Sequence, residues 1–338
     1  MKHTARAGSS AALPMSRPLA GFVAGMACAV APVWVAAQPT TPAAAQIVIP
    51  GRNLMTESLT STADGSVIIG SIGARAIFRA PPGAAAAERW IGPATDGFYQ
   101  VLGVFADDAA KTLWACSSNI DDDKPGPPSA LYAFDLSTGA TKGHWPLPTA
   151  GAFCNDIAVG SDGTAYVTDS ANMQIVRLSP GAASIEVWTG NGEFGAKGKV
   201  LDGIAVIDGN VVVNVLETGK LFTVPIGADG KADTVREVAL DRPLKNPDGQ
   251  RSFGSHGLLV VESGDGGRLS RVDFTPDVTL GKVTTVQEGF ADGAASVTVV
   301  GETAYVLQAQ WDAAKHEQEP GYQPKPFTAI GVPVGKHD

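Results

Sequence analysis

The chain has 338 residues, with 40 glycines, 23 prolines, 17% charged residues and a formal net charge of −9 at pH 7. This turn-rich composition disfavours a helical bundle, and the length permits either two domains or one large all-β propeller or barrel. The acidic balance makes nucleic acid a poor partner.

The N-terminal segment is typical of a secretory signal peptide. It opens with three cations, Lys2, Arg6 and Arg17. The apolar run PLAGFVAGMACAVAPVWVAA follows, and the small residues at its end precede a cleavage site before Gln38. Two alternatives stay open: an uncleaved anchor, because about 20 apolar residues can span a bilayer, and a lipoprotein cut before Cys28.

This pattern predicts three parts of the chain: a signal peptide at 1–37, a Pro/Ala-rich linker at 38–46 and the folded domain at 47–338. The mature protein would be periplasmic or secreted, with no stable membrane insertion. Cleavage removes three cations and no anion, so the mature chain would carry 22 cations against 34 anions, a net charge of −12. A small molecule therefore remains the expected partner.

A β-hairpin pattern recurs six times along the chain. Each copy is a short apolar segment, a turn with Asp, Gly or Ser, and a second alternating segment. The copies are 43 to 55 residues apart, and they begin at Glu57, Gln100, Asn155, Asp202, Asp248 and Ala294. Further strand-like pieces, such as RAIFRA and MQIVRL, follow the hairpins, so each repeat predicts a sheet of four strands.

Radial repetition of four-stranded sheets predicts an all-β fold, a six-bladed β-propeller. A β-helix would need shorter and more regular coils, and a sandwich has only about seven strands. The last blade would end in FTAIGVPV, and IVIPG at 47–51 would close the ring by joining that blade. Trp114, Tyr166 and Tyr305 lie within alternating strands and are predicted to pack in the core.

The first residue of each innermost strand of a propeller lies at one end of the central channel, so equivalent positions converge. Five of the six residues aligned at this position carry a side-chain oxygen: Glu57, Gln100, Asn155, Asp202 and Asp248. Converging carboxylates repel one another unless a cation offsets them, and Ca²⁺ prefers an all-oxygen shell. We therefore expect an axial Ca²⁺, with Zn²⁺, Mn²⁺ and Mg²⁺ as alternatives. For any single residue the competing interpretation is a turn, because LDG and PDG are ordinary turn sequences.

These motifs resemble those of the SMP-30/gluconolactonase family, calcium-dependent six-bladed propellers related to the paraoxonases and strictosidine-synthase-like proteins. The resemblance spans residues 55 to 310. It implies four metal ligands: Glu57 in MTESLT, Asn155 in CNDIAV, Asp202 in LDGIAV and Asp248 in NPDGQ. Two features depart from the family: MTESLT lacks the commoner Glu-Gly-Pro context, and Asp202 replaces the usual Asn, which adds an anionic ligand.

The resemblance implies hydrolysis of a lactone or a related ester. The ion would polarise the carbonyl oxygen, and Asp248 would take a proton from the attacking water. Asp248 could equally be a ligand only, because a bound cation lowers the pKa of a carboxylate. Gln100, Asn119 and Asp156 are candidate contacts to the substrate. Asp156 could instead support the ligands or form an Asx turn, and Asn119 could be an ordinary loop residue.

Two other functions stay open: a non-catalytic scaffold propeller with a structural axial metal, and a ligand-binding propeller for transport or sensing.

Cys116 and Cys154 could pair in an oxidising compartment, although two buried free cysteines are the favoured interpretation. The run DDDKPGPP at 121–128 lacks the spacing of an EF-hand and is predicted to be an exposed loop. The scattered histidines give little support to a His-rich zinc site.

Overall fold

The structure is a computed structural model that describes residues 45–93, 97–120, 126–190, 192–195, 198–290, 293–311, 316, 319, 321–322 and 325–336. The predicted signal peptide and most of the predicted linker lie outside the described residues, as does the acidic part of the run at 121–128. Within the described part of the chain, no helix has the length and apolar character needed to cross a bilayer.

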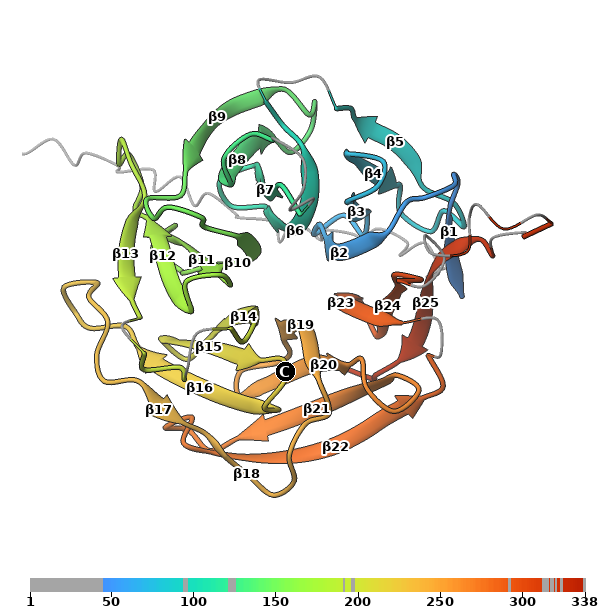
Figure 1. Ribbon diagram of the computed structural model, residues 1–338. Helices are drawn as coiled ribbons and strands as arrows, with labels where there is room; N and C mark the ends of the chain where they lie inside the picture. The colour runs from blue at the N-terminus through green and yellow to red at the C-terminus, as the bar shows by residue number, and fades with distance from the viewer. Residues whose placement is uncertain are drawn as a thin grey trace, which may run out of the picture. The chain divides into compact units, whose positions relative to one another are not determined.

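Six sheets are arranged around one axis, each with four antiparallel strands, and the predicted six-bladed propeller is confirmed (Figure 1). The innermost strands are β2 (Thr56–Ser61), β6 (Gln100–Asp107), β10 (Cys154–Val159), β14 (Leu201–Ile207), β19 (Pro247–Ser252) and β23 (Ala294–Val300). The second strands are β3 (Val67–Ser71), β7 (Thr112–Ser118), β11 (Ala165–Asp169), β15 (Asn210–Val215), β20 (Gly257–Glu262) and β24 (Thr303–Gln308).

The outer half of each blade completes the sheet. The third strands are β4 (Ala76–Ala80), β8 (Ala130–Asp135), β12 (Gln174–Leu178), β16 (Lys220–Pro225), β21 (Arg268–Phe274) and β25 (Phe327–Pro333). The outermost strands are β5 (Glu88–Ile91), β9 (Thr141–Pro146), β13 (Glu186–Thr189), β17 (Arg236–Glu237), β22 (Leu280–Glu288) and β1 (Gln46–Ile49). A short strand, β18 (Ala239–Leu240), runs parallel to β22 at the edge of the fifth blade.

Strand β1 closes the ring. It pairs antiparallel with β25, so the beginning of the described chain supplies the outer strand of a blade whose other strands come from its end. Ile47 and Ile49 of this strand are 2% and 1% exposed, and they join the same apolar cluster as Leu59 of the first blade. The predicted closure by the segment at 47–51 is confirmed.

The core lies between the blades. The innermost strands are buried on both faces because each packs against the inner strands of both neighbouring blades. Tyr166 and Tyr305 are 1% and 2% exposed, which confirms their predicted place in the core. Trp114 is half-buried and packs against Trp145, with the ring centroids 6.0 Å apart.

The hairpin turns predicted from Asp and Gly lie at the far ends of the inner strands. Asp208 and Gly209 have φ values of 49° and 72° and form the two-residue turn between β14 and β15. In the turn before β11, the backbone N–H of Thr164 donates to Asp162 Oδ1 at 2.9 Å. The starts of the inner strands therefore meet at the opposite end of the channel.

Cys116 and Cys154 form a disulfide, with 5.2 Å between their Cα atoms. The favoured interpretation of two free cysteines was wrong. The bond joins β7 of the second blade to β10 of the third, two strands that lie against each other across the boundary between the blades. The spacing of 38 residues along the sequence could not show this pairing, because the packing of neighbouring blades creates it.

Candidate metal centre at the channel mouth

A β-bulge near the start of the inner strands aims the acidic side chains. The pairing of β10 with β11 skips from Cys154 to Ile157, which places Asn155 in the bulge. The same break places Glu57 in a bulge of β2, Asp202 in β14 and Asp248 in β19. A bulge bends its strand and redirects a side chain, so these four residues are strand residues at equivalent positions and not members of turns.

The register corrects the alignment of the other two blades. In β6 the break lies between Val101 and Val104, so the position equivalent to Asn155 is Leu102 and not Gln100. In β23 it lies between Ala294 and Ser296, so the equivalent residue is Ala295. The ring of six positions thus holds four oxygen-bearing and two apolar side chains.

Glycines that follow the ring positions allow the inner strands to approach closely. A Cβ atom at Gly203 would lie 2.4 Å from the carbonyl oxygen of Asp248, and one at Gly103 would lie 2.3 Å from that of Asn155. Both distances are far below van der Waals contact, so a side chain cannot be placed at either position without moving the backbone. The Asp-Gly sequence of LDG therefore reflects a close approach of two strands, a role that glycine also has outside turns.

Three carboxyl groups converge at the centre of this ring. Glu57, Asp202 and Asp248 each direct a carboxylate oxygen to within 4.8 Å of the others, and their side chains are buried. Burial, followed by repulsion from the Asp156 carboxylate, raises the pKa of Asp202 to about 8. Burial and the neighbouring carboxylates raise the pKa of Glu57 and Asp248 well above their ordinary values. The three carboxyl groups thus resist being ionised together, and a bound cation would stabilise their ionised forms.

The amide of Asn155 is oriented with its oxygen available. Its Nδ2 donates to Asp202 Oδ1 and to Ser170 Oγ, both at 3.1 Å. Ser170 Oγ itself donates to the Leu201 carbonyl at 2.6 Å, so it accepts from Asn155 and fixes which end of the amide carries nitrogen. Asn155 Oδ1 and Glu57 Oε2 are buried and have no hydrogen-bond partner among the described residues. Buried oxygens without donors are what a cation site requires.

The donor set fits a hard divalent cation. Carboxylate oxygens from three blades converge, and the amide of Asn155, from a fourth blade, lies beside them. Ca²⁺ binds carboxylate and amide oxygens with six to eight ligands at about 2.3 to 2.6 Å. Four protein residues leave room in that shell for water or for a substrate oxygen. The arrangement therefore resembles an open metal site more than a closed structural one.

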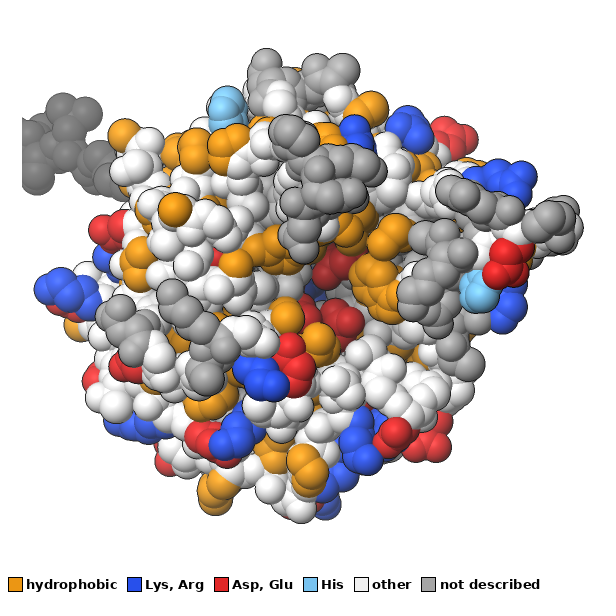
Figure 2. Space-filling model, in the orientation of Figure 1, with side chains coloured by type: hydrophobic (Ala, Val, Ile, Leu, Met, Phe, Trp, Pro, Cys, Tyr) orange, Lys and Arg blue, Asp and Glu red, His pale blue; other side chains and the backbone are white. Residues whose placement is uncertain are grey.

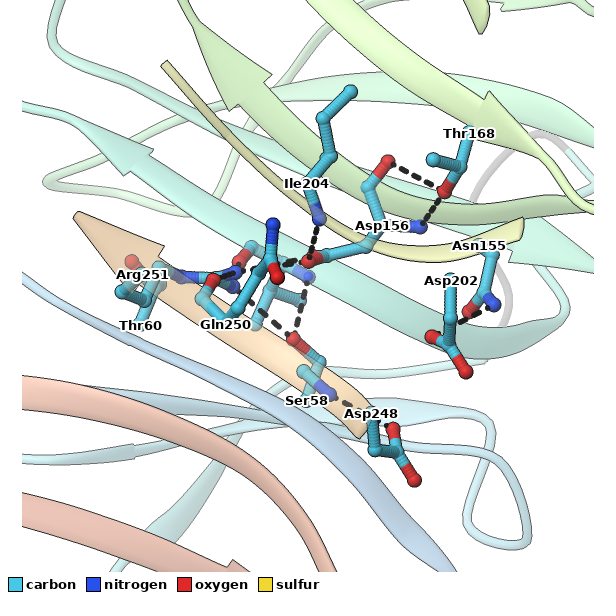
Figure 3. A network of polar contacts seen from close by, with 12 residues as sticks. Ser58, Thr60, Asn155, Asp156, Thr168, Asp202, Ile204, Asp248, Gln250 and Arg251 are labelled. Atoms are coloured by element: carbon cyan, nitrogen blue, oxygen red, sulfur yellow. Dashed lines mark hydrogen bonds and ion pairs between the residues drawn. The ribbon is translucent and has the colours of Figure 1, made fainter. Parts of the chain in front are cut away.

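A buried ion pair lies farther along the channel, and sequence reasoning missed its cation, Arg251. Figure 3 shows Asn155, Asp202 and Asp248 at one side of the network and Arg251 with Asp156 at the other. Arg251 Nη1 lies 3.0 Å from Asp156 Oδ2, and the same carboxylate oxygen accepts the backbone N–H of Ile204 at 3.2 Å. Asp156 is therefore a strand residue held by protein donors and does not form an Asx turn.

Arg251 crosses the channel from the fifth blade. Its Nη2 donates to the carbonyl oxygens of Val104 at 3.0 Å and Leu59 at 3.3 Å. Together with the bonds to Asp156, these contacts tie five of the six blades at one level below the carboxylates. The segment PDGQRS gave one signal: Arg251 is a cation at a strand position where the other five repeats have an uncharged residue, Thr60, Phe105, Ala158, Ala205 and Thr298.

The remaining predicted substrate contacts lie at the same end of the channel. Gln100 is 5% exposed, and its Oε1 accepts the backbone N–H of Ile120 at 2.7 Å. Asn119 is half-buried just after the end of β7. The structure thus brings the four predicted metal ligands together, places Gln100 and Asn119 near the mouth, and places Asp156 deeper in the channel.

No protein-family model and no curated protein matches the chain. Among solved structures, one named as a gluconolactonase shares 15% identity at a TM-score of 0.59, covering 85% of this chain and 91% of that one. Luciferin-regenerating enzyme shares 10% at a TM-score of 0.59, covering 84% and 92%. The calcium-binding protein regucalcin from Agrobacterium tumefaciens shares 14% at a TM-score of 0.54, covering 86% and 97%.

These similarities confirm, at the level of the fold, the resemblance to gluconolactonase-like propellers. The same fold also carries other activities, because similar structures include virginiamycin B lyase from Staphylococcus aureus and a PQQ-bound aldose sugar dehydrogenase from Streptomyces coelicolor. Function must therefore be argued from the residues of the site.

Proposed function

We propose that the protein is a metal-dependent hydrolase of a lactone or a related ester, with Ca²⁺ as the expected ion. The observation that carries the proposal is the cluster of Glu57, Asp202 and Asp248, whose oxygens converge within 4.8 Å beside the unpartnered amide oxygen of Asn155. Structures named as gluconolactonase and regucalcin share the fold and support a small-molecule substrate.

The four ring residues would hold the ion and leave part of its shell open to the channel mouth. When bound, a divalent ion supplies electrostatic stabilisation of the charge that develops on a carbonyl oxygen. Asp248 is the proposed general base. The backbone N–H of Gly249 donates to its Oδ1 at 2.9 Å, which fixes the carboxylate so that the other oxygen can accept a proton from water.

The scaffold alternative is less well supported by the contacts. Arg251 and Asp156 together already link five blades across the axis, the disulfide joins the second blade to the third, and β1 closes the ring. An ion whose only role was to hold the blades together would duplicate these links. The open side of the donor set instead favours an ion that contacts a substrate.

We place the mature protein in an oxidising compartment, periplasmic or secreted. The disulfide between Cys116 and Cys154 supports this proposal, because such bonds persist mainly outside the reducing cytosol. The cationic and apolar N-terminal sequence supports it independently. N-terminal sequencing of the protein recovered from a bacterial periplasm would test cleavage before Gln38.

The test of the activity is lactone hydrolysis by the purified mature chain, first after chelation and then after Ca²⁺, Mn²⁺, Mg²⁺ or Zn²⁺ is restored singly. We expect activity to disappear on chelation and to return with one ion, and to be lost in Asp248→Ala even where the ion still binds. Thermal stabilisation by the ion without hydrolysis of any lactone or ester would instead support a ligand-binding or scaffold propeller.

A further inference from the structure

The mouth of the channel has an apolar wall on one side. Figure 2 shows hydrophobic side chains gathered beside a central hollow, with acidic side chains at its floor. Leu102 occupies the ring position of the second blade and is 4% exposed. One apolar cluster includes Leu102 and the half-buried side chains Met55, Ile120, Phe153 and Trp311.

The chain positions of these residues place them at the same end as the carboxylates. Met55 and Phe153 directly precede the inner strands β2 and β10, whose first residues lie at the mouth. Ile120 and Trp311 follow β7 and β24, which run antiparallel to their inner strands and end at the mouth. Four blades thus contribute an apolar side chain to the wall.

Trp311 extends this wall to the sixth blade. Its indole Cδ1 lies 3.0 Å from the point that a Cβ of Gly293 would occupy. The indole therefore lies over the start of β23. The ring position of that blade is Ala295, which is fully buried and offers no oxygen. The two ring positions without a carboxyl or amide group, Leu102 and Ala295, therefore both belong to blades that contribute to the apolar wall.

Three glutamines at the mouth are engaged by the protein itself. Gln100 Oε1 accepts the N–H of Ile120, and Gln308 Oε1 accepts the hydroxyl of Thr328 at 2.9 Å. Gln310 Nε2 donates to the carbonyl oxygens at 325 and 326, at 3.3 and 3.0 Å. These amides shape the loops around the mouth, and their bonds to the protein compete with bonds to a substrate.

The mouth has an apolar wall on one side and the carboxyl groups of the ring at its floor. From this arrangement we infer that the site takes a lactone or ester with an apolar substituent, such as an alkyl-substituted γ-lactone, rather than a polyhydroxylated sugar lactone. The carbonyl end would face the carboxylate ring, and the alkyl group would lie against Leu102, Phe153 and Trp311. A substrate hydroxyl against this wall would lose water without gaining a partner, which costs binding free energy. The inference rests on the proposed hydrolase function.

The experiment measures kcat/KM for γ-butyrolactone and for γ-lactones that carry butyl, hexyl and octyl groups, together with a polyhydroxylated γ-lactone. Each buried CH₂ group should raise kcat/KM by up to about fourfold until the wall is filled. The corresponding alkyl γ-lactams, which resist hydrolysis, are titrated by calorimetry as a measure of binding alone. Their affinity should rise along the same series, with a negative change in heat capacity.

Two tryptophan variants locate the effect. Trp311→Ala should flatten the dependence on alkyl length and lower kcat/KM for the octyl lactone by about tenfold or more. Trp90→Ala is the matched control, because Trp90 is also half-buried but lies on β5, the outermost strand of the first blade. This control should keep the wild-type dependence on alkyl length.

The outcomes separate the inference from the function on which it rests. If the polyhydroxylated lactone is preferred, or if neither hydrolysis nor lactam binding depends on alkyl length, the apolar specificity is wrong while the hydrolase can stand. If no lactone is hydrolysed but lactam affinity rises with alkyl length and falls in Trp311→Ala, the apolar site stands and the hydrolase function is overturned.

Discussion

At the scale of single residues, Asp202 determines how much charge the ring carries. It lies within hydrogen-bonding distance of Asn155 and shares the centre with Glu57 and Asp248. Asn155 is neutral, so Asp202 is one of three acidic residues in the ring. Its replacement by an amide would keep an oxygen at the site and remove one unit of charge.

Asp202→Asn should therefore weaken Ca²⁺ binding and stabilise the metal-free protein. Removing one carboxylate relieves repulsion in the empty ring, and it also removes part of the attraction for the cation. We expect the dissociation constant for Ca²⁺ to rise by about tenfold or more, equivalent to about 1.4 kcal/mol, and the Tm in chelator to increase. Calorimetric titration and thermal unfolding measure the two effects. Asp108→Asn, at an exposed site, is the control, and equal effects in both variants would contradict this role for Asp202.

Arg251 and Asp156 should behave as one unit in stability measurements. Arg251→Met leaves the Asp156 carboxylate buried without its cation, which should lower the free energy of unfolding by about 3 to 5 kcal/mol. Combining it with Asp156→Asn removes the unpaired charge, so the double variant should be more stable than the sum of the single losses predicts. Denaturant unfolding of the four proteins gives the coupling energy. Strict additivity would show that the pair does not interact as the structure indicates.

At the scale of elements, the disulfide fastens β7 to β10 beside the ring. Loop-closure entropy for a separation of 38 residues gives an upper stabilisation of about 4 kcal/mol. The double variant Cys116→Ser/Cys154→Ser should therefore unfold at lower denaturant concentration than the oxidised wild type. Wild-type protein unfolded in a strong reductant is the control and should show a similar loss. An unchanged midpoint in both would mean that the bond is not formed in solution.

The repeated hairpins could be predicted from the sequence. The residue at the ring position could not be predicted for two of them, the hairpins of the second and sixth blades. Alternating apolar segments and Asp-Gly turns are local signals, and they were sufficient for six blades and for the ring closure by β1. A bulge adds one residue to a strand, and nothing in QVLGV shows where it falls. Leu102 therefore replaced Gln100 at the ring only when the register of β6 with β7 was known.

The features of the site that could not be predicted from the sequence depend on residues that are distant along the chain. The four proposed metal ligands could be predicted because each stands in a repeated motif. Arg251 stands in no motif, and its partners come from three other blades that are distant in sequence. The same reason applies to the pairing of Cys116 with Cys154, which requires two neighbouring blades to be packed.

At the scale of the whole molecule, the ring should make the stability of the metal-free protein fall as pH rises. The folded-state pKa values of Glu57, Asp202 and Asp248 are raised, so the folded chain binds more protons than the unfolded chain between about pH 4 and pH 8. Stability is then greatest below the unfolded pKa values and is lost as pH passes through the folded ones. The Tm in chelator should decrease between about pH 5 and pH 8.

Calcium should remove most of this decrease, because the ion replaces the protons and binds more tightly to the ionised ring at higher pH. The control is the triple variant Glu57→Gln/Asp202→Asn/Asp248→Asn, which should show neither the decrease nor its reversal by calcium. A metal-free Tm that rises steadily over this pH range would contradict the assignment of the raised pKa values to the ring.

We expect one divalent cation to bind at the ring, and the stoichiometry of metal binding measures this. The mature chain is freed of metal by chelation and titrated with Ca²⁺ by calorimetry, alongside Glu57→Gln and Asp248→Asn. We expect one ion per wild-type chain and a marked loss of affinity in both variants. No bound ion in the wild type, or unchanged affinity in both variants, would contradict it.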